Sequence, residues 1–218
     1  EKHNARCRNE GAFDTAVRAL AAAREAGLYT IIQTLVLAKE IDKGELFRFF
    51  SFARSLGVNE VRIMEPIRSG NLFNGTDGLF YSREDRERLI CIQHRANSSF
   101  RFPRVSSFAH TESEGKYGCG AGVQHSYISA EGDLYPCDFV PLSFGNVIRT
   151  DVESLWRSMN QAMGGPHIGC FAFSSHDKIQ TAGQSGFPVE PEESRSICIS
   201  ARPHQFPRYY RILQGKKH

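Results

Sequence analysis

Two cysteines, at positions 119 and 137, bracket the segment that most restricts the fold of this chain. A strand-like run over 126–129 is followed by a turn at 130–133, and a second run ends just before the second cysteine. Antiparallel strands return to where they began, so this pattern predicts a hairpin with Cys119 and Cys137 at one end. Paired thiols of this kind suit a metal ion or an iron–sulfur cluster. The competing interpretation is two buried structural cysteines, because unpaired cysteine is often buried.

The length of 218 residues allows one large domain or two small ones. A hydrophobic content of 40% and a charged content of 23% are typical of a globular protein, and a net charge of +3 predicts no nucleic-acid partner. No apolar run approaches the roughly 20 residues of a membrane helix, so no membrane association is expected. The chain opens on Glu1 without a secretory signal pattern, which predicts a fragment or processed piece and a cytoplasmic location.

The six cysteines also indicate metal binding more than disulfide bonding. Without an export signal, a reducing compartment is expected, and thiols there bind metals more often than they pair. Cys7 lies in a polar segment and is predicted to be exposed, whereas Cys91 lies among apolar residues and is predicted to be core. Metal ligation is therefore assigned to the four later cysteines.

The first hundred residues alternate between helical and strand patterns. Helices are expected to end at Gly27 and Gly57, and the run over 29–37 is predicted to be a strand buried on both faces. A further strand is expected over 61–66, and a further helix from Ser82 to about residue 96. Helices and strands that alternate with short connections predict an α/β fold with parallel strands.

The second half carries fewer regular patterns. Thr150 and Glu153 have the spacing of a capping box and predict a short helix that contains Leu155 and Trp156. From Gly164 to the end, scattered Gly, Ser and Pro residues predict no regular element.

Two stretches of the sequence resemble radical SAM enzymes that carry a C-terminal SPASM or twitch domain. Residues 11–70 resemble the later βα units of the radical SAM partial barrel. Cys119, twelve residues, Gly132, four residues and Cys137 are similar to the opening signature of SPASM and twitch domains. Pro136, the pair at 145–146 and the helix with Leu155 and Trp156 also fit that family.

The resemblance implies an α/β fold: the C-terminal half of a (β/α)6 partial barrel over 1–100, then a small α+β SPASM/twitch-like domain with the cysteine-flanked hairpin over 101–218. The CxxxCxxC motif that holds the family's catalytic cluster is absent, because no two cysteines here are that close. The resemblance therefore implies a parent enzyme whose N-terminal part lies outside this chain. With two cysteines downstream of Cys137, one auxiliary cluster is expected, which favours the twitch-like arrangement.

Four thiolates suffice for one 4Fe–4S cluster. The expected metal ligands are Cys119, Cys137, Cys170 and Cys198. Cys198 lies in an alternating apolar run that a buried strand would explain equally well, and a fourth position open to substrate is an alternative. By residue type alone, zinc bound by four cysteines, or by three and a histidine, is equally possible. The histidines considered for it are His125, His167 and His204.

The barrel half has its own candidate residues, because parallel α/β sheets bind ligands at the C-terminal ends of their strands. The resemblance places five residues near the adenosine of S-adenosyl-L-methionine (SAM) or near the substrate. They are Gln33, Thr34, Met64, Glu65 and Pro66. Simple strand packing is the alternative interpretation.

The resemblance implies a function for the parent protein. SAM cleavage would give a 5′-deoxyadenosyl radical that abstracts hydrogen from a substrate, and the auxiliary cluster would bind substrate or accept an electron. The chain alone is expected to be inactive, and a peptide, a carbohydrate or a small metabolite all stay open as substrate. The alternatives are a zinc-stabilised binding module without catalysis and a metal-free fragment that needs its missing half to fold.

Overall fold

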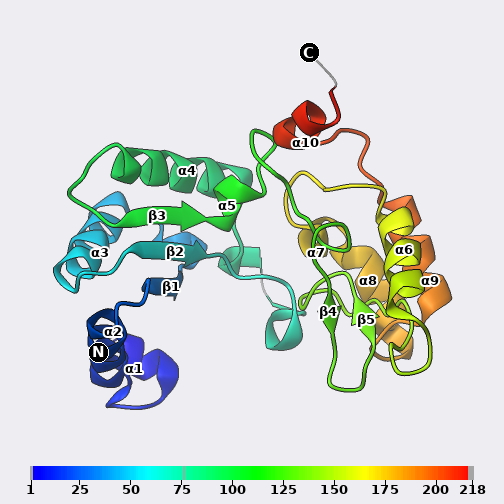
Figure 1. Cartoon of the computed structure of the whole chain (residues 1–218), viewed down its shortest axis with the longest axis horizontal. Coiled ribbons are helices and arrows are strands. Elements are labelled where there is room, and N and C mark those ends of the chain that lie inside the picture. The colour runs from blue at the N-terminus through cyan, green and yellow to red at the C-terminus, as the bar shows by residue number, and fades with distance from the viewer. Residues whose placement is uncertain (1, 76, 216–218) are drawn as a thin grey trace. The chain divides into compact units, whose positions relative to one another are not determined.

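The computed structural model describes residues 2–75 and 77–215 (Figure 1). Within these residues the chain divides into two compact units. Unit 1 contains the chain up to Pro66 together with Gly78–Phe108, and unit 2 contains Ile67–Asp77 together with the chain from Ala109 onward. The assignment of a barrel half and a cluster-binding domain, divided at residue 100, stays a prediction.

A parallel sheet forms the centre of unit 1. Its strands, in spatial order and within the described residues, are β1 (Ile31–Leu35), β2 (Glu60–Met64) and β3 (Arg104–Ser107). Ile31 lies opposite Glu60, which lies opposite Arg104. The mixed α/β class and the parallel pairing are confirmed, and the larger (β/α)6 barrel stays a prediction.

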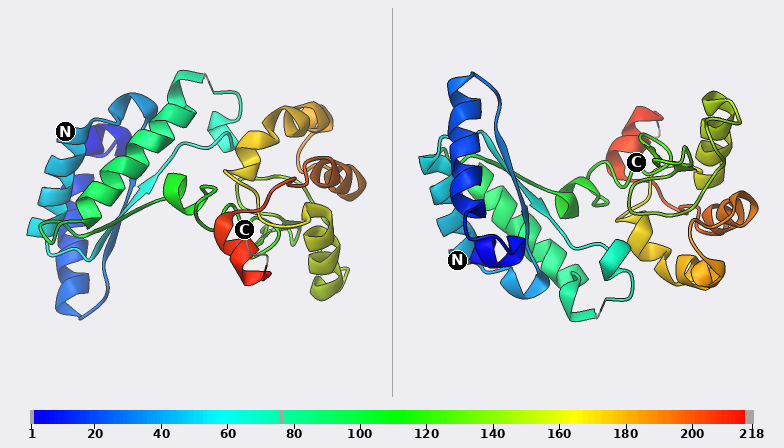
Figure 2. Two further views of the ribbon diagram at one scale, coloured as in Figure 1. Left: turned by 90° about the horizontal axis from the view of Figure 1, so that it is seen from above. Right: turned by 90° about the horizontal axis from the view of Figure 1, so that it is seen from below.

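Unit 1 contains four α-helices among its described residues, and two of them begin at side-chain caps. They are α1 (Lys2–Cys7), α2 (Ala12–Glu25), α3 (Lys43–Ser55) and α4 (Arg83–Asn97). Asp42 caps α3 by accepting a hydrogen bond of 2.8 Å from the Glu45 N–H. Ser82 and Asp85 form a reciprocal capping box at the start of α4. Figures 1 and 2 show α4 running along the sheet beside β3.

One expectation for β1 is wrong, because the strand is not buried on both faces. Gln33 is exposed and Leu35 is 42% exposed. Among the described residues, β1 pairs only with β2 and lies at the edge of the sheet. A β-branched, apolar run therefore formed the strand as predicted, but its position in the sheet decided its burial.

Unit 2 contains an antiparallel pair of short strands and the helix α6. β4 (Tyr127–Ile128) pairs with β5 (Leu134–Tyr135), and Gly132 adopts a φ of 92° in the turn between them. The helix α6 (Val152–Met163) ends at Gly164, whose φ is 74°. Its cap is Asp151, which accepts from the Ser154 N–H at 2.8 Å, so the predicted cap at Thr150 is wrong by one residue.

The prediction of no regular structure after Gly164 is also wrong. The chain there forms α7 (Phe171–Ser174), α8 (His176–Ala182), α9 (Pro191–Ser200) and α10 (Arg208–Leu213). These helices are short, and the Gly and Pro residues of this part of the chain lie at their ends or between them, so the sequence shows no long apolar period. The remaining short elements are α5 (Phe108–Thr111), η1 (Ala38–Glu40), η2 (Gly70–Leu72), η3 (Asp77–Leu79) and η4 (Gly183–Ser185). No helix in the described part of the chain has the length and apolar character needed to cross a membrane.

The four later cysteines are part of the hydrophobic core of unit 2. They pack with aromatic and aliphatic side chains from β5, α6 and α7, among them Leu134, Met159 and Phe171. Cys7 and Cys91 are exposed, so the prediction of a core position for Cys91 is wrong. Cys91 lies on α4 between buried Leu89 and Ile92, but it faces away from the sheet.

We expect Phe50→Ala to lower the free energy of unfolding of unit 1 by about 3–5 kcal/mol, because Phe50 is completely buried and its removal leaves a cavity. Phe100→Ala is the matched control, since Phe100 is completely exposed. Urea unfolding monitored by far-UV circular dichroism measures both. Equal destabilisation by the two substitutions would contradict the assigned core.

Candidate metal centre

Backbone pairing brings Cys119 close to Cys170. The Cys119 N–H donates to the His167 carbonyl at 2.7 Å, and the His167 N–H donates to the Cys119 carbonyl at 3.0 Å. Cys170 follows three residues later and occupies the N-cap position of α7. The Cys170 thiol hydrogen-bonds to the Cys119 sulfur. Two cysteines fifty-one positions apart in sequence therefore meet through a β-bridge.

A second backbone hydrogen bond brings the end of the hairpin to the same segment. The Gly122 N–H donates to the Pro136 carbonyl at 2.8 Å, directly before Cys137. Gly122 has a φ of 66°, and a Cβ there would meet Met163 at 2.8 Å, so glycine is required for this approach. Burial is the main cause of the raised pKa of Cys137, and the charge of Cys119 adds to it.

The pKa values of the three thiols differ because their hydrogen bonds differ. The Cys170 thiol, with the N–H groups of Phe171 and Ala121, lowers the pKa of Cys119 to about 6 despite burial. Cys170 keeps the shared proton and is buried, so its pKa is raised. Burial raises the pKa of Cys137 to about 12, against a hydrogen bond from the Phe139 N–H.

Each of these three sulfurs thus has a backbone N–H donor. Cys119 has those of Phe171 and Ala121, Cys137 has that of Phe139, and Cys170 has that of Phe173. Backbone N–H groups directed at cysteine sulfurs stabilise thiolate charge and tune the potential of an iron–sulfur cluster. These donors could not be predicted from the sequence. Every residue except proline has a backbone N–H, and only the fold determines which of them point toward a sulfur.

Cys198 differs from the other three cysteines, because in the described part of the chain neither a thiol nor a backbone N–H contributes to its pKa. It is fully buried on α9, which packs against α6, and not on the strand considered from the sequence. Pro191 at the first helical turn and Glu192 after it explain why the segment is a helix. Among the described residues, burial is the cause of its pKa being raised to about 12, and no thiol or charge contributes.

The thiols fit the chemistry of an iron–sulfur cluster. Three of them, Cys119, Cys137 and Cys170, are buried, interact with one another and have N–H donors. Within residues 2–75 and 77–215, no three His, Cys, Asp or Glu side chains converge closely enough to hold one metal ion. Buried cysteine sulfurs of this kind fit the donor set of an iron–sulfur cluster.

Of the three histidines considered for zinc, only His167 lies at this centre. His125 and His204 are exposed, whereas His167 is 6% exposed and pairs with Cys119 through the backbone. One ring nitrogen donates to the Met163 carbonyl, and the buried Nε2 has no hydrogen-bond partner. Burial lowers the pKa of His167 to about 4, so the imidazole is neutral at pH 7.

The residues expected to contact SAM or substrate lie in unit 1. Gln33 and Thr34 are on β1, and Met64 ends β2 just before Glu65 and Pro66. Leu35 lies opposite Met64 in the parallel register, so the C-terminal ends of both strands share one edge of the sheet. In α/β folds, ligands bind at the C-terminal ends of the parallel strands, where these residues lie. Their role stays a prediction.

Glu65 is the one ionisable side chain among these five residues, and its pKa is raised. It is 6% exposed, and Arg86 of α4 contacts its Oε2 at 3.2 Å. Burial raises the pKa of Glu65, although the nearby Arg86 charge opposes the shift. The Tyr81 hydroxyl donates to the Val36 carbonyl at 2.7 Å beside this edge. Arg86 and Tyr81 were not identified from the sequence, because nothing in a helix or loop pattern marks a partner across the sheet.

The comparison with known proteins supports the interpretation of unit 2. Residues 119–180 match the family model of SPASM, the iron–sulfur cluster-binding domain. The matched stretch contains Cys119, Cys137 and Cys170 and ends before Cys198. No curated protein matches the chain.

We expect the stability of the protein relative to Glu65→Gln to fall as pH rises. Because the folded pKa of Glu65 is raised, its contribution is complete below the unfolded value near 4.5 and is lost as pH rises through the folded pKa. Urea unfolding at pH 4, 5, 6 and 7 measures the difference between the two proteins. Glu193→Gln, at an exposed site, is the control. A difference that stays constant with pH would contradict the burial of an ionisable Glu65.

We expect Gly118→Ala to destabilise unit 2 by about 2–4 kcal/mol and to separate Cys119 from Cys170. Gly118 has a φ of 74°, and a Cβ there would lie 2.4 Å from the His167 carbonyl that binds the Cys119 N–H. Gly115→Ala is the matched control, since the nearest atom to its Cβ would be 4.0 Å away. Urea unfolding and the rate of thiol labelling at Cys119 measure the effect. A variant as stable as the control would show that the bridge does not depend on Gly118.

Proposed function

The chain carries a SPASM iron–sulfur cluster-binding domain, and we propose that this domain holds one auxiliary 4Fe–4S cluster. Cys119, Cys137 and Cys170 are the proposed ligands, and Cys198 is the proposed fourth. The observation that carries the proposal is the β-bridge between Cys119 and His167, which brings buried Cys119 and Cys170 into one core cluster with Cys137.

The protein prepares the ligands in three ways. The low pKa of Cys119 supplies one thiolate near neutral pH, and Cys170 would have to lose its proton to ligate a metal. The N–H groups of Ala121, Phe139 and Phe173 stabilise the sulfur charge. The surrounding core excludes water from the sulfurs. When bound, the cluster supplies one-electron transfer or an open iron site for a substrate atom.

We further propose that the chain is the C-terminal part of a radical SAM enzyme. The resemblance described above links SPASM domains to radical SAM enzymes, and residues 119–180 match a SPASM model. Unit 1 also contains parallel strands of the kind expected in the partial barrel. Gln33, Thr34, Met64, Glu65 and Pro66 would then help to position SAM and substrate. The CxxxCxxC motif of the catalytic cluster does not occur in this sequence.

A second candidate is the zinc-stabilised binding module without catalysis. The observation that favours it is the unpartnered Nε2 of His167 beside Cys119, because three cysteines and a histidine form a familiar zinc site. The match to an iron–sulfur domain model weighs against it.

Anaerobic reconstitution of the full chain with iron and sulfide should give about four irons and four sulfides per chain, with a broad absorbance near 400 nm. Single substitutions to serine at Cys119, Cys137 and Cys170 should each lower the iron content at least twofold. Cys91→Ser is the matched control, because that thiol is exposed on unit 1. One tightly bound zinc without iron uptake would contradict the cluster and favour the zinc module.

Cys198→Ser tests the fourth ligand separately. If Cys198 ligates, the variant should show less iron and an altered electron paramagnetic resonance spectrum after reduction. An unchanged spectrum would exclude Cys198 and assign the fourth position to another ligand, for which His167→Ala is the next variant to measure.

A further inference from the structure

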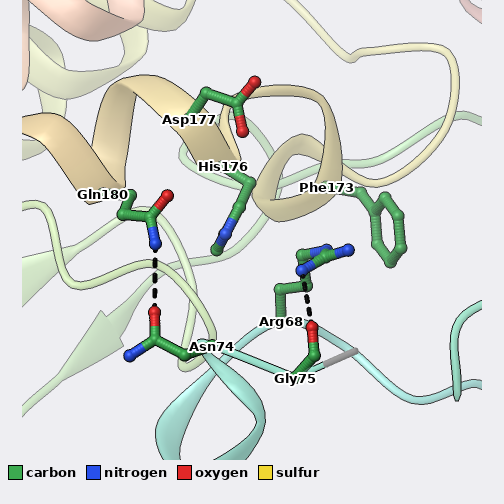
Figure 3. A pocket seen from close by; sticks show the side chains of 7 residues that line it. All are labelled: Arg68, Asn74, Gly75, Phe173, His176, Asp177 and Gln180. Atoms are coloured by element: carbon green, nitrogen blue, oxygen red, sulfur yellow. Dashed lines mark hydrogen bonds between the residues drawn. The ribbon is translucent and has the colours of Figure 1, made fainter. Parts of the chain in front are cut away.

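A cavity of about 340 Å³ lies between helices α7 and α8 and the loop that carries Arg68 and Asn74 (Figure 3). Gln180 Nε2 donates to Asn74 Oδ1 at 3.0 Å, and Arg68 Nη1 donates to the Gly75 carbonyl at 3.0 Å. Figure 3 shows the Asp177 carboxylate directed away from both hydrogen bonds. The polar groups of this cavity are therefore largely partnered within the protein, and the surface around α10 offers a ligand more unpaired charge.

Helix α10 and the segment 114–117 form one surface of unit 2, although they lie far apart in sequence. The Arg208 N–H donates to the Glu114 carbonyl at 2.8 Å, and the Tyr209 N–H donates to the Lys116 carbonyl at 3.2 Å. Figure 1 shows α10 beside the loop that follows α5. We call the side chains of α10, together with those of Lys116 and Tyr117, the α10 surface.

Apolar side chains on the α10 surface are open to solvent. Tyr117 is 50% exposed, and its ring packs against that of Tyr209 with centroids 5.0 Å apart. Ile212 and Leu213, which are 52% and 83% exposed, lie three and four positions after Tyr209 and share its face of α10. Single exposed apolar residues are ordinary, whereas a group of them on one face indicates an interaction site.

The same surface carries three positive charges. Lys116 Nζ lies 5.2 Å from the centre of the Tyr209 ring. Arg208 and Arg211 are neighbours one turn apart on α10, and Arg211 Nε is buried without a hydrogen-bond partner. Within the described part of the chain, none of these three cations forms an ion pair. The adjacent Glu114 carboxylate accepts a hydrogen bond from a glutamine amide instead. Like charges one turn apart destabilise a helix, so an anionic partner would stabilise this one.

We propose that the α10 surface docks an acidic segment of a partner protein that also carries apolar side chains. The carboxylates of the segment pair with the two guanidinium groups and the ammonium group, which form charge-assisted hydrogen bonds with such anions. Its apolar side chains cover the exposed tyrosines and aliphatic residues. Complementary charge then sets the orientation and the rate of association, and the covered apolar area contributes affinity.

Two other anionic partners fit the α10 surface less well. Lys116 lies over the Tyr209 ring, and the rings of Tyr117 and Tyr209 are tilted by 40° to each other, so no flat platform is open to a stacked base. Helix α10 has six residues, whereas many helices that lie in a membrane interface have about 20–30. A peptide segment with carboxylates and apolar side chains matches both the charges and the apolar face.

Docking at the α10 surface does not require the proposed cluster. None of its four proposed ligands lies on α10 or at 116–117. Binding can therefore be measured on the full chain with or without iron, and its failure is distinct from failure of cluster assembly.

The test is the fluorescence anisotropy of a labelled short peptide, in which glutamates flank leucine and phenylalanine, during titration with the full chain. One comparison peptide has glutamine in place of glutamate, and another has serine in place of leucine and phenylalanine. The first peptide should bind at least tenfold more tightly than either, and its affinity should fall as the salt concentration rises. Equal binding of the glutamine version would overturn the proposal. Tighter binding of single-stranded oligothymidylate or of phosphatidylserine vesicles would also overturn it, as would no change in anisotropy at the highest soluble concentration of the chain.

Two substitutions test the charged and the apolar part of the surface. Arg208→Gln should weaken peptide binding at least fivefold, because it removes an exposed charge and keeps the backbone hydrogen bond of this residue. Leu213→Ser, at a highly exposed position, should weaken binding at least threefold. Arg149→Gln and Ile148→Ser are the matched controls, since both residues are exposed and lie outside the α10 surface. Equal binding by wild type and all four variants would overturn the proposal.

Discussion

The β-bridge between Cys119 and His167 is the interaction on which the organisation of unit 2 depends. Its two hydrogen bonds, of 2.7 and 3.0 Å, join segments that are almost fifty residues apart in sequence. Cys170 follows directly at the start of α7, so the bridge also places its thiol against Cys119. The approach is possible because Gly118 has no side chain to meet the His167 carbonyl.

The environment of the thiols combines burial with directed backbone dipoles. Burial alone raises a thiol pKa, as it does at Cys198. At Cys119 the Cys170 thiol and two N–H donors reverse that effect, so a thiolate is available in an apolar core. This combination provides both the ligand charge and the exclusion of water that an iron–sulfur cluster requires. Cys198 has the burial without the donors, which is why its role needs an experiment of its own.

The sequence by itself determined the local elements and the chemistry of the ligands. The helix start at Ser82 and the spacing of Cys119, Gly132 and Cys137 could be predicted, because they depend on contacts within a few residues or on a recurring motif. Only the tertiary structure decided that β1 lies at a sheet edge, that Cys91 faces outward, and that Cys198 lies on a helix. It also decided which backbone N–H groups meet the sulfurs and that Arg86 meets Glu65. These features depend on long-range packing, in which distant segments supply the partner, and no local pattern records it.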